Sequence, residues 1–174
     1  DFMSLPDFGR KDLEFGPMSP VVSPELRSSR SLLTEIQQHD RFIHVPYHTF
    51  DYLIRLLQEA VVSPRVRSIK MSLYRVAGHS KVVQALIAGA RNGKKVTVLV
   101  ELMARFDEQE NISVAHILQE AGVKVLFGPE GLKVHAKLVL IGMRKSRDIA
   151  CISTGNFHEG TARHYTDVLL FTSR

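Results

Sequence analysis

A histidine and a lysine stand two residues apart in an otherwise apolar run, GLKVHAKLVLIG, at residues 131–142. If this run is a strand, His135 and Lys137 lie on one face, with Cβ atoms roughly 7 Å apart. A neutral imidazole is a nucleophile, and an ammonium group beside it can stabilise charge on a phosphoryl group. The pair therefore predicts phosphoryl chemistry, and the alternative is the exposed polar face of an edge strand.

The same run predicts which side of the strand is buried. Val134, Leu138 and Leu140 share the face opposite His135. Because these three side chains are apolar, we expect their face to pack into the core and the histidine face to point towards a site.

Further polar side chains follow other expected strand ends, where ligands gather in open α/β sheets. Tyr74 and Arg75 follow one strand, and Glu101 and Arg105 follow the next. A guanidinium group suits bidentate contact with phosphate, although a single loop arginine is better explained by solvation or by a local acid. Two arginines in matched positions favour an anion site at this edge of the sheet.

A third polar group comes from the stretch STGNFHEGTARHYTD at residues 153–167. Its small-residue turn leads to Asn156 directly after an expected strand. Gly155 allows close backbone approach, and the asparagine amide offers both a donor and an acceptor. This turn strengthens the hypothesis that His135 and Lys137 belong to a site.

Hydrophobic periodicity indicates the helices that must position these residues. Four helices are expected, at residues 31–40, 50–62, 80–93 and 111–122. Thr49, Ser80 and Asn111 are candidate N-caps, and Gly93 and Gly122 are candidate helix terminators.

Strand patterns alternate with the later helices and then follow one another directly. Strands are expected at residues 66–76, 94–102, 123–128, 133–143, 148–154 and 165–172, and residues 41–50 are expected to be extended. Strand and helix in alternation predict parallel βαβ units, and the final strands predict antiparallel additions. The predicted fold class is α/β, a mixed sheet flanked by helices.

Composition fits one soluble domain with a core, because the chain has 174 residues and is 44% hydrophobic. No apolar run is long enough to span a bilayer, and no signal peptide is expected. Cys151 is the single cysteine, which excludes an intrachain disulfide and fits a reducing compartment. Its apolar surroundings in the sequence predict a buried small hydrophobe. The net charge of +5 favours anionic partners without choosing among them.

The motifs together resemble the phospholipase D superfamily half-site, in which the histidine is the covalent phosphoryl acceptor. The usual aspartate of that half-site would fall at position 142, where this chain has Gly142, which argues against an ordinary phosphodiesterase. One branch of the superfamily is more similar. The stretches IKMSLYRVA, VELMARFDEQENI, GLKVHAKLVLI and TGNFHEGTARHYTD resemble polyphosphate kinase of the long-chain, histidine-phosphorylating type. The resemblance implies its first C-terminal, phospholipase D-like domain.

The resemblance implies a role for each matching residue. His135 matches the histidine that ATP phosphorylates and that passes the group to polyphosphate. Lys137 and Asn156 match residues that orient phosphoryl oxygens. Tyr165 matches a tyrosine near the nucleotide, although a tyrosine that opens a strand is often only packed.

Two arginines are implied at a magnesium–phosphate site. These are Arg75 and Arg105, and because a guanidinium group cannot ligate a cation, we expect them to hold the phosphates that carry Mg²⁺. No role follows for His158, Arg163 or His164, for which surface placement is expected.

The implied partners are ATP, inorganic polyphosphate and other domains of a longer chain. Residues 1–30 are rich in Pro, Ser and Gly and predict a linker or the tail of a preceding domain, with the catalytic domain at 31–174. The missing Met at position 1 and a strand-like C-terminus predict a fragment, which we expect to have little turnover alone. The full-length protein is expected to be a homo-oligomer in the cytoplasm, with membrane association open.

Two other functions fit the sequence less well. One is a phosphodiesterase or nuclease that assembles two half-sites in a dimer, against which Gly142 argues. The other is a non-catalytic module that binds a polyanion. The net charge permits such a module, but the basic residues are scattered along the sequence without an aromatic stacking run, so no nucleic acid is expected.

Overall fold

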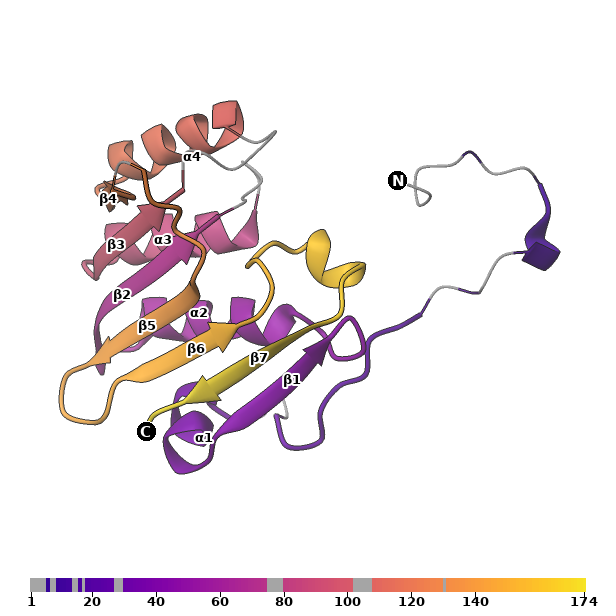
Figure 1. The fold of residues 1–174 in the computed structure, drawn as a ribbon. Helices are drawn as coiled ribbons and strands as arrows, with labels where there is room; N and C mark the ends of the chain where they lie inside the picture. Colours follow the sequence, from indigo (N-terminus) through magenta and orange to yellow (C-terminus); the bar gives the residue numbers. More distant parts are fainter. Residues whose placement is uncertain are drawn as a thin grey trace.

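A mixed sheet of seven strands forms the centre of the molecule (Figure 1). The computed structural model describes residues 6, 9–13, 16, 18–26, 30–74, 80–101, 108–129 and 131–174. The strand order is β1-β7-β6-β5-β2-β3-β4. In chain order the strands are β1 (Arg41–Val45), β2 (Val66–Leu73), β3 (Lys95–Val100), β4 (Lys124–Phe127), β5 (Lys137–Met143), β6 (Ile149–Ser153) and β7 (Asp167–Thr172).

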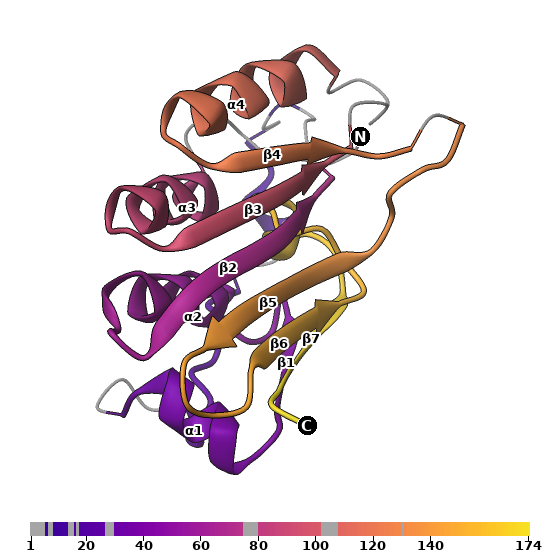
Figure 2. The ribbon, with the colours of Figure 1, turned by 90° about the vertical axis from the view of Figure 1, so that its left-hand side faces the viewer.

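The α-helices of the described residues lie side by side on one face of this sheet (Figure 2). They are α1 (Leu32–Gln38), α2 (Asp51–Val62), α3 (Lys81–Arg91) and α4 (Glu108–Glu120), and the short 3-10 helices are η2 (Lys11–Leu13) and η3 (Thr161–Arg163). In the described part of the chain, no helix combines the length and the apolar character needed to cross a bilayer.

Strand direction divides the sheet into a parallel and an antiparallel part. β2, β3 and β4 run parallel, with α3 and α4 between them in the chain. β5 pairs antiparallel with β2, and β6, β7 and β1 continue the antiparallel part. The predicted α/β mixed sheet is therefore confirmed.

Three predicted helix boundaries, in α3 and α4, are confirmed. The hydroxyl of Ser80 accepts a hydrogen bond from the backbone N–H of Val82, at 3.1 Å, and so caps α3. Gly93 and Gly122 follow α3 and α4 with φ of 76° and 85°, the left-handed region that a helix terminator needs.

Two predicted caps differ from the structure. Phe50 is the N-cap of α2, and Thr49 lies one residue earlier, where its hydroxyl still accepts a hydrogen bond from the N–H of Asp51 at 3.2 Å. The prediction for Asn111 is wrong, because α4 already begins at Glu108. Asn111 is buried inside the helix, and its amide bonds to the sheet instead of capping the helix.

The prediction for the buried face of β5 is also wrong. Leu138 is 41% exposed, and Val134 and Leu140 are half-buried. Val139 and Ile141, on the histidine side of the strand, are fully buried, because the helices cover that side of the sheet. The face of Lys137 is therefore continuous with the core.

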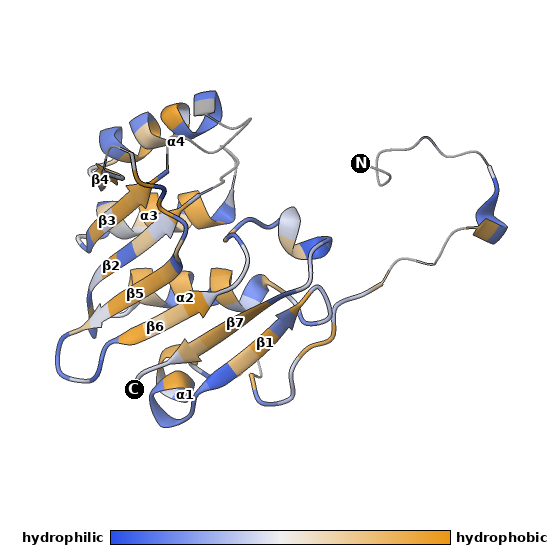
Figure 3. Ribbon diagram, viewed as in Figure 1, coloured by the Kyte–Doolittle hydropathy of each residue, from blue (hydrophilic) through white to orange (hydrophobic). Residues whose placement is uncertain are grey.

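The uncovered face of the sheet carries an apolar row across four strands, which explains the error. Leu138 pairs with Ile152, Ile152 with Leu170, and Leu170 with Phe42. Figure 3 shows these strands as mainly hydrophobic. Because both faces of β5 carry branched apolar side chains, alternation alone could not indicate which of them meets the helices.

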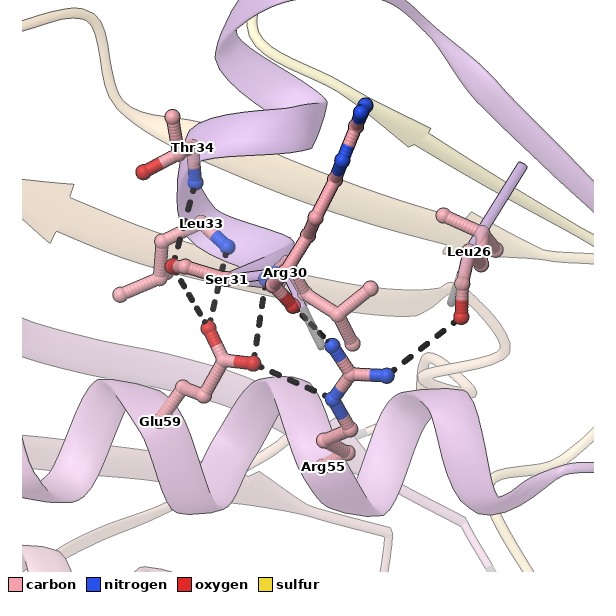
Figure 4. Close-up of polar contacts among 8 residues, drawn as sticks. Leu26, Arg30, Ser31, Leu33, Thr34, Arg55 and Glu59 are labelled. Carbon is pink, nitrogen blue, oxygen red and sulfur yellow. Dashed lines mark hydrogen bonds and ion pairs between the residues drawn. The ribbon is translucent and has the colours of Figure 1, made fainter. Parts of the chain in front are cut away.

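The carboxylate of Glu59 and the guanidinium group of Arg55, both in α2, bind the segment before α1 (Figure 4). Glu59 accepts hydrogen bonds from the hydroxyl of Ser31 at 2.9 Å and from the N–H of Leu32 at 3.0 Å. Arg55 pairs with Glu59 at 3.2 Å and donates to the carbonyls of Leu26 and Arg30. These contacts satisfy backbone groups at the start of α1 that a short helix leaves open.

Cys151 lies in β6 and is 1% exposed, which confirms it as a buried small hydrophobe. Burial raises the pKa of its thiol above the usual range, so the thiol stays protonated and unreactive.

Candidate functional site

The candidate site lies at the end of the sheet where β2, β3 and β6 finish and β5 begins. A hollow of about 490 Å³ opens there, lined by residues 135–138 and 152–154. His135 stands two residues before the first residue of β5, so it belongs to the segment that enters the strand. The predicted pair of His135 and Lys137 is thus brought to one hollow at a strand end.

The backbone on both sides of His135 is held by side chains from the neighbouring strands. The buried carboxylate of Glu101, directly after β3, accepts a hydrogen bond from the N–H of Val134 at 2.6 Å. The hydroxyl of Ser72, in β2, donates to the carbonyl of Ala136 at 2.6 Å and accepts from the N–H of Leu138 at 3.0 Å. Hydrogen bonds therefore hold the backbone on both sides of His135.

The ring of Tyr74 sits against the His135 imidazole and two ammonium groups. The two rings meet edge to face, with centroids 5.3 Å apart. The Nζ atoms of Lys133 and Lys137 each lie 5.2 Å from the tyrosine ring centroid, within the range of a cation–π interaction. His135 is exposed, and its ring makes no hydrogen bond within the described part of the chain, so both ring nitrogens are accessible.

Lys137 is buried beneath the histidine, with 7% exposure. Its ammonium group donates a hydrogen bond to the carbonyl of His135 at 2.6 Å. Desolvation lowers the pKa of Lys137, the charge of Lys133 lowers it further, and the carboxylate of Asp167 opposes both effects. The ammonium group of Lys137 thus lies next to the candidate nucleophile, although its burial costs solvation free energy.

The small-residue turn after β6 depends on glycine. A Cβ atom on Gly155 would lie 2.1 Å from the carboxylate of Asp167 and 2.8 Å from its Cβ atom, so no side chain fits. The same carboxylate accepts a hydrogen bond from the hydroxyl of Thr154 at 2.7 Å. Asn156 follows, and its side-chain Oδ1 is buried without a hydrogen-bond partner among the described residues.

The chain is similar in sequence to known proteins. Residues 31–174 match the family model of the polyphosphate kinase C-terminal domain 1. The chain belongs to the polyphosphate kinase family. It is 47% identical to the polyphosphate kinase of Vibrio parahaemolyticus over 99% of its own length and 25% of that protein. The chain therefore spans about a quarter of the length of this curated relative.

Solved structures agree on the fold. The crystal structure of polyphosphate kinase from Porphyromonas gingivalis superimposes with a TM-score of 0.83 at 43% identity, over 98% of this chain and 29% of that one. Nuc from Salmonella typhimurium, a phospholipase D family member, superimposes with a TM-score of 0.61 at 14% identity, over 76% of this chain and 81% of that one. The second match shows the fold alone, and it confirms the predicted phospholipase D-like sheet.

The remaining residues that the polyphosphate kinase resemblance implies are less closely placed. Tyr165 lies between η3 and β7, at the same end of the sheet as His135, and is 64% exposed. It makes no contact with His135 among the described interactions. Arg75 and Arg105 lie outside the described residues, so their roles stay predictions.

The loop that carries Asn156 and Tyr165 is tied to the start of α3. Glu159 accepts hydrogen bonds from the hydroxyl of Ser80, at 2.9 and 3.0 Å, and from the N–H of Val82 at 3.3 Å. A carboxylate at a helix N-terminus is favoured by the exposed N–H groups there. His158 has a structural role that the sequence did not indicate, because its Nδ1 accepts from two backbone N–H groups of its own turn.

Ser72 and Asn111 are the site residues that sequence reasoning missed. The amide of Asn111 donates to the carbonyls of Tyr74 at 2.9 Å and Glu101 at 2.8 Å, and so ties the ends of β2 and β3 together. Tyr74 and Glu101 had a signal in the sequence, since they directly follow strands. Ser72 had none, because a serine within a strand is ordinary until its pairing with β5 is known.

Gly142, which replaces the usual aspartate of the phospholipase D half-site, lies far from His135. It is buried near the far end of β5, seven residues from His135, which is roughly 23 Å along a strand. A Cβ atom there would lie 2.3 Å from the hydroxyl of Ser68. A side chain at position 142 therefore bears on strand packing and cannot contact His135 directly.

The described residues do not fit a magnesium site held by protein alone. They contain no group of three or more His, Cys, Asp and Glu side chains that could hold a metal ion. Proteins bind Mg²⁺ through a few carboxylates together with substrate phosphates.

Proposed function

We propose that His135 takes the terminal phosphoryl group of ATP and passes it to polyphosphate, in a full-length polyphosphate kinase of which this chain is one domain. The observation that supports this most is the exposed imidazole whose backbone is fixed on both sides by Glu101 and Ser72. A nucleophile held in one place avoids the entropic cost of orienting it during the reaction.

The reaction proceeds in two displacements at the same phosphorus. An unprotonated ring nitrogen of His135 attacks the γ-phosphorus, an N–P bond forms, and ADP leaves with the electrons of the broken P–O bond. A terminal oxygen of polyphosphate then attacks this phosphorus, the N–P bond breaks, and the neutral imidazole returns. The polymer grows by one phosphate. The phosphohistidine and the phosphoanhydrides of ATP and polyphosphate are all high-energy forms, so the sequence is reversible.

The residues around His135 supply charge and orientation in this proposal. Lys137 uses one of its three N–H donors on the carbonyl of His135, which leaves two for phosphoryl oxygens. Asn156 would donate a hydrogen bond from its side-chain Nδ2 to the same group, because an amide oxygen only accepts. Arg75 and Arg105 would hold the nucleotide phosphates that carry Mg²⁺, and Tyr165 would lie beside the nucleotide. The full-length protein would be a cytoplasmic homo-oligomer whose other domains complete the site.

Phosphohistidine formation tests the proposal in the full-length protein. After incubation with γ-labelled ATP, the wild-type protein should carry acid-labile, base-stable label, and His135→Ala should carry none. His116→Ala is the matched control, because His116 is an exposed histidine on α4 that pairs only with Glu120 among the described residues. Full labelling of His135→Ala would show that the assignment is wrong.

A further inference from the structure

A strongly basic surface lies at the end of the sheet opposite the candidate site. It consists of three neighbouring segments, residues 63–67 before and within β2, residues 91–95 before β3, and residues 144–148 between β5 and β6; we call it the basic end. Figure 1 shows the β5–β6 loop at this end, and Figure 3 shows it as hydrophilic.

The basic end accounts for the whole positive charge of the chain. Its fifteen residues contain eight lysines and arginines and one carboxylate, that of Asp148. The rest of the chain has fifteen lysines and arginines against seventeen aspartates and glutamates, a net charge of −2. The basic residues that are scattered in sequence are therefore gathered in space, contrary to the expectation that argued against a polyanion-binding role.

The three segments are in contact, so their charges form one surface. The ammonium group of Lys94 donates to the carbonyls of Ser63 at 2.5 Å and Val66 at 3.1 Å. The N–H of Arg144 donates to the carbonyl of Arg65 at 2.8 Å. Burial lowers the pKa of Lys94, and the positive charge of Arg144 lowers it further.

Counter-charge is scarce at the basic end. Asp148 pairs with Arg67 at 3.5 Å and also accepts from the N–H of Met143. Lys95 and Lys145 are exposed, and neither side chain makes a hydrogen bond or an ion pair within the described part of the chain. Cations held together without counter-ions create a positive potential that attracts an extended polyanion.

We propose that the basic end binds a stretch of inorganic polyphosphate away from the reacting terminus. The proposal rests on the function proposed above, which supplies a long polyanion to the same molecule. Arg144 stands nine residues from His135, roughly 30 Å along an extended chain. Only a long polymer can reach both places, so this contact would retain a growing polyphosphate and leave ATP binding unaffected.

The test measures binding of end-labelled polyphosphate to the full-length protein at low and high salt. Lys95→Gln with Lys145→Gln should weaken the binding of long polyphosphate about three- to tenfold at low salt, and the difference should shrink at high salt. Triphosphate binding, the KM for ATP and labelling of His135 should not change. The matched control is Lys11→Gln with Lys81→Gln, which removes two exposed lysines elsewhere.

Several outcomes would overturn the proposal. An equal loss in the control pair would indicate a general effect of net charge. An unchanged affinity for long polyphosphate would exclude the surface. If the Lys95 and Lys145 variant lost affinity for single-stranded DNA or anionic vesicles as strongly as for polyphosphate, the surface would serve a different polyanion. If the wild-type protein itself carried no label at His135, the proposed function would be contradicted, and the binding result would still be interpretable.

Discussion

The carboxylate of Glu101 accepts a hydrogen bond from the backbone N–H of Val134, the residue directly before the candidate nucleophile. Glu101 is 4% exposed and lies at the end of β3, whereas Val134 lies in the segment that leads to β5. This bond crosses from the parallel to the antiparallel part of the sheet. It makes the position of His135 depend on a side chain two strands away.

Removing the Glu101 carboxylate should slow phosphorylation of His135. We expect Glu101→Ala to reduce the initial rate of label incorporation by about 10- to 100-fold with little change in the KM for ATP, because the histidine loses orientation. Glu101→Gln keeps an acceptor oxygen and should recover much of the rate. Glu120→Ala, which changes an exposed carboxylate of α4, is the control. Equal rates in Glu101→Ala and the wild type would refute a positioning role.

Ser72 should contribute to both stability and rate. Ser72→Ala leaves the carbonyl of Ala136 and the N–H of Leu138 without their partner, and we expect a loss of about 1 kcal/mol in the free energy of unfolding. Amide exchange at Leu138 should accelerate. Ser68→Ala changes the same residue type in the same strand, where the hydroxyl makes no hydrogen bond within the described residues. The prediction fails if both variants behave alike in exchange and denaturation.

A side chain at position 155 should disrupt the turn that carries Asn156. Gly155→Ala would place a Cβ atom 2.8 Å from that of Asp167, and we expect destabilisation of about 2 kcal/mol together with slower phosphoryl transfer. Thermal denaturation and label incorporation measure the two effects. Gly16→Ala is the control, since an added Cβ atom there has no neighbour within 4 Å among the described residues. A fully stable Gly155→Ala protein would contradict the described turn.

The buried charge of Lys137 should lower the stability of the fold and promote phosphorylation of His135. Burial lowers its pKa below that of the unfolded chain, so between the two values the unfolded state binds more protons, and stability rises with pH through that window towards about 10.5. Below the window the buried charge destabilises the fold. We therefore expect Lys137→Met to unfold at a higher temperature at neutral pH, to lose this alkaline rise, and to be poorly phosphorylated.

The control for Lys137 is Lys133→Met, which changes an exposed lysine beside the same tyrosine ring. Because the charge of Lys133 contributes to the lowered pKa of Lys137, its removal should narrow the alkaline rise in stability without abolishing it. If Lys137→Met proved less stable than the wild type across the whole pH range, the hydrogen bond to the carbonyl of His135 would outweigh the desolvation of the charge.

Much of the fold could be predicted because periodicity is local. Ser80, Gly93 and Gly122 delimit helices through contacts within a few residues, and the βαβ order follows from alternating patterns. The buried face of β5 could not be predicted, since Leu138 and Val139 are equally apolar and only the helices distinguish them. Asn111 was misassigned because an asparagine in the first turn resembles an N-cap in sequence.

The candidate site likewise contains residues that could be predicted from the sequence and residues that could not. His135, Lys137 and Asn156 could be found from residue type and spacing, because their motifs are short. The support given by Ser72 depends on which strand lies beside β5, and the hydrogen bond from Leu138 to Ser72 joins residues 66 positions apart. The clustering of Lys95 and Lys145 likewise depends on the order of strands in the sheet. Contacts between distant segments are outside what one sequence read alone can supply.

The place of Gly142 near the far end of β5 has a consequence for protein engineering. Gly142→Asp restores the aspartate of the diester-cleaving half-site on paper, yet it puts a carboxylate roughly 23 Å from His135 and against the hydroxyl of Ser68. Anyone seeking to convert this scaffold into a hydrolase by that single change would alter the packing of β2 against β5 and leave the nucleophile untouched. Redesign of the reaction has to begin at residues 72 and 101, whose side chains hold the backbone on the two sides of His135.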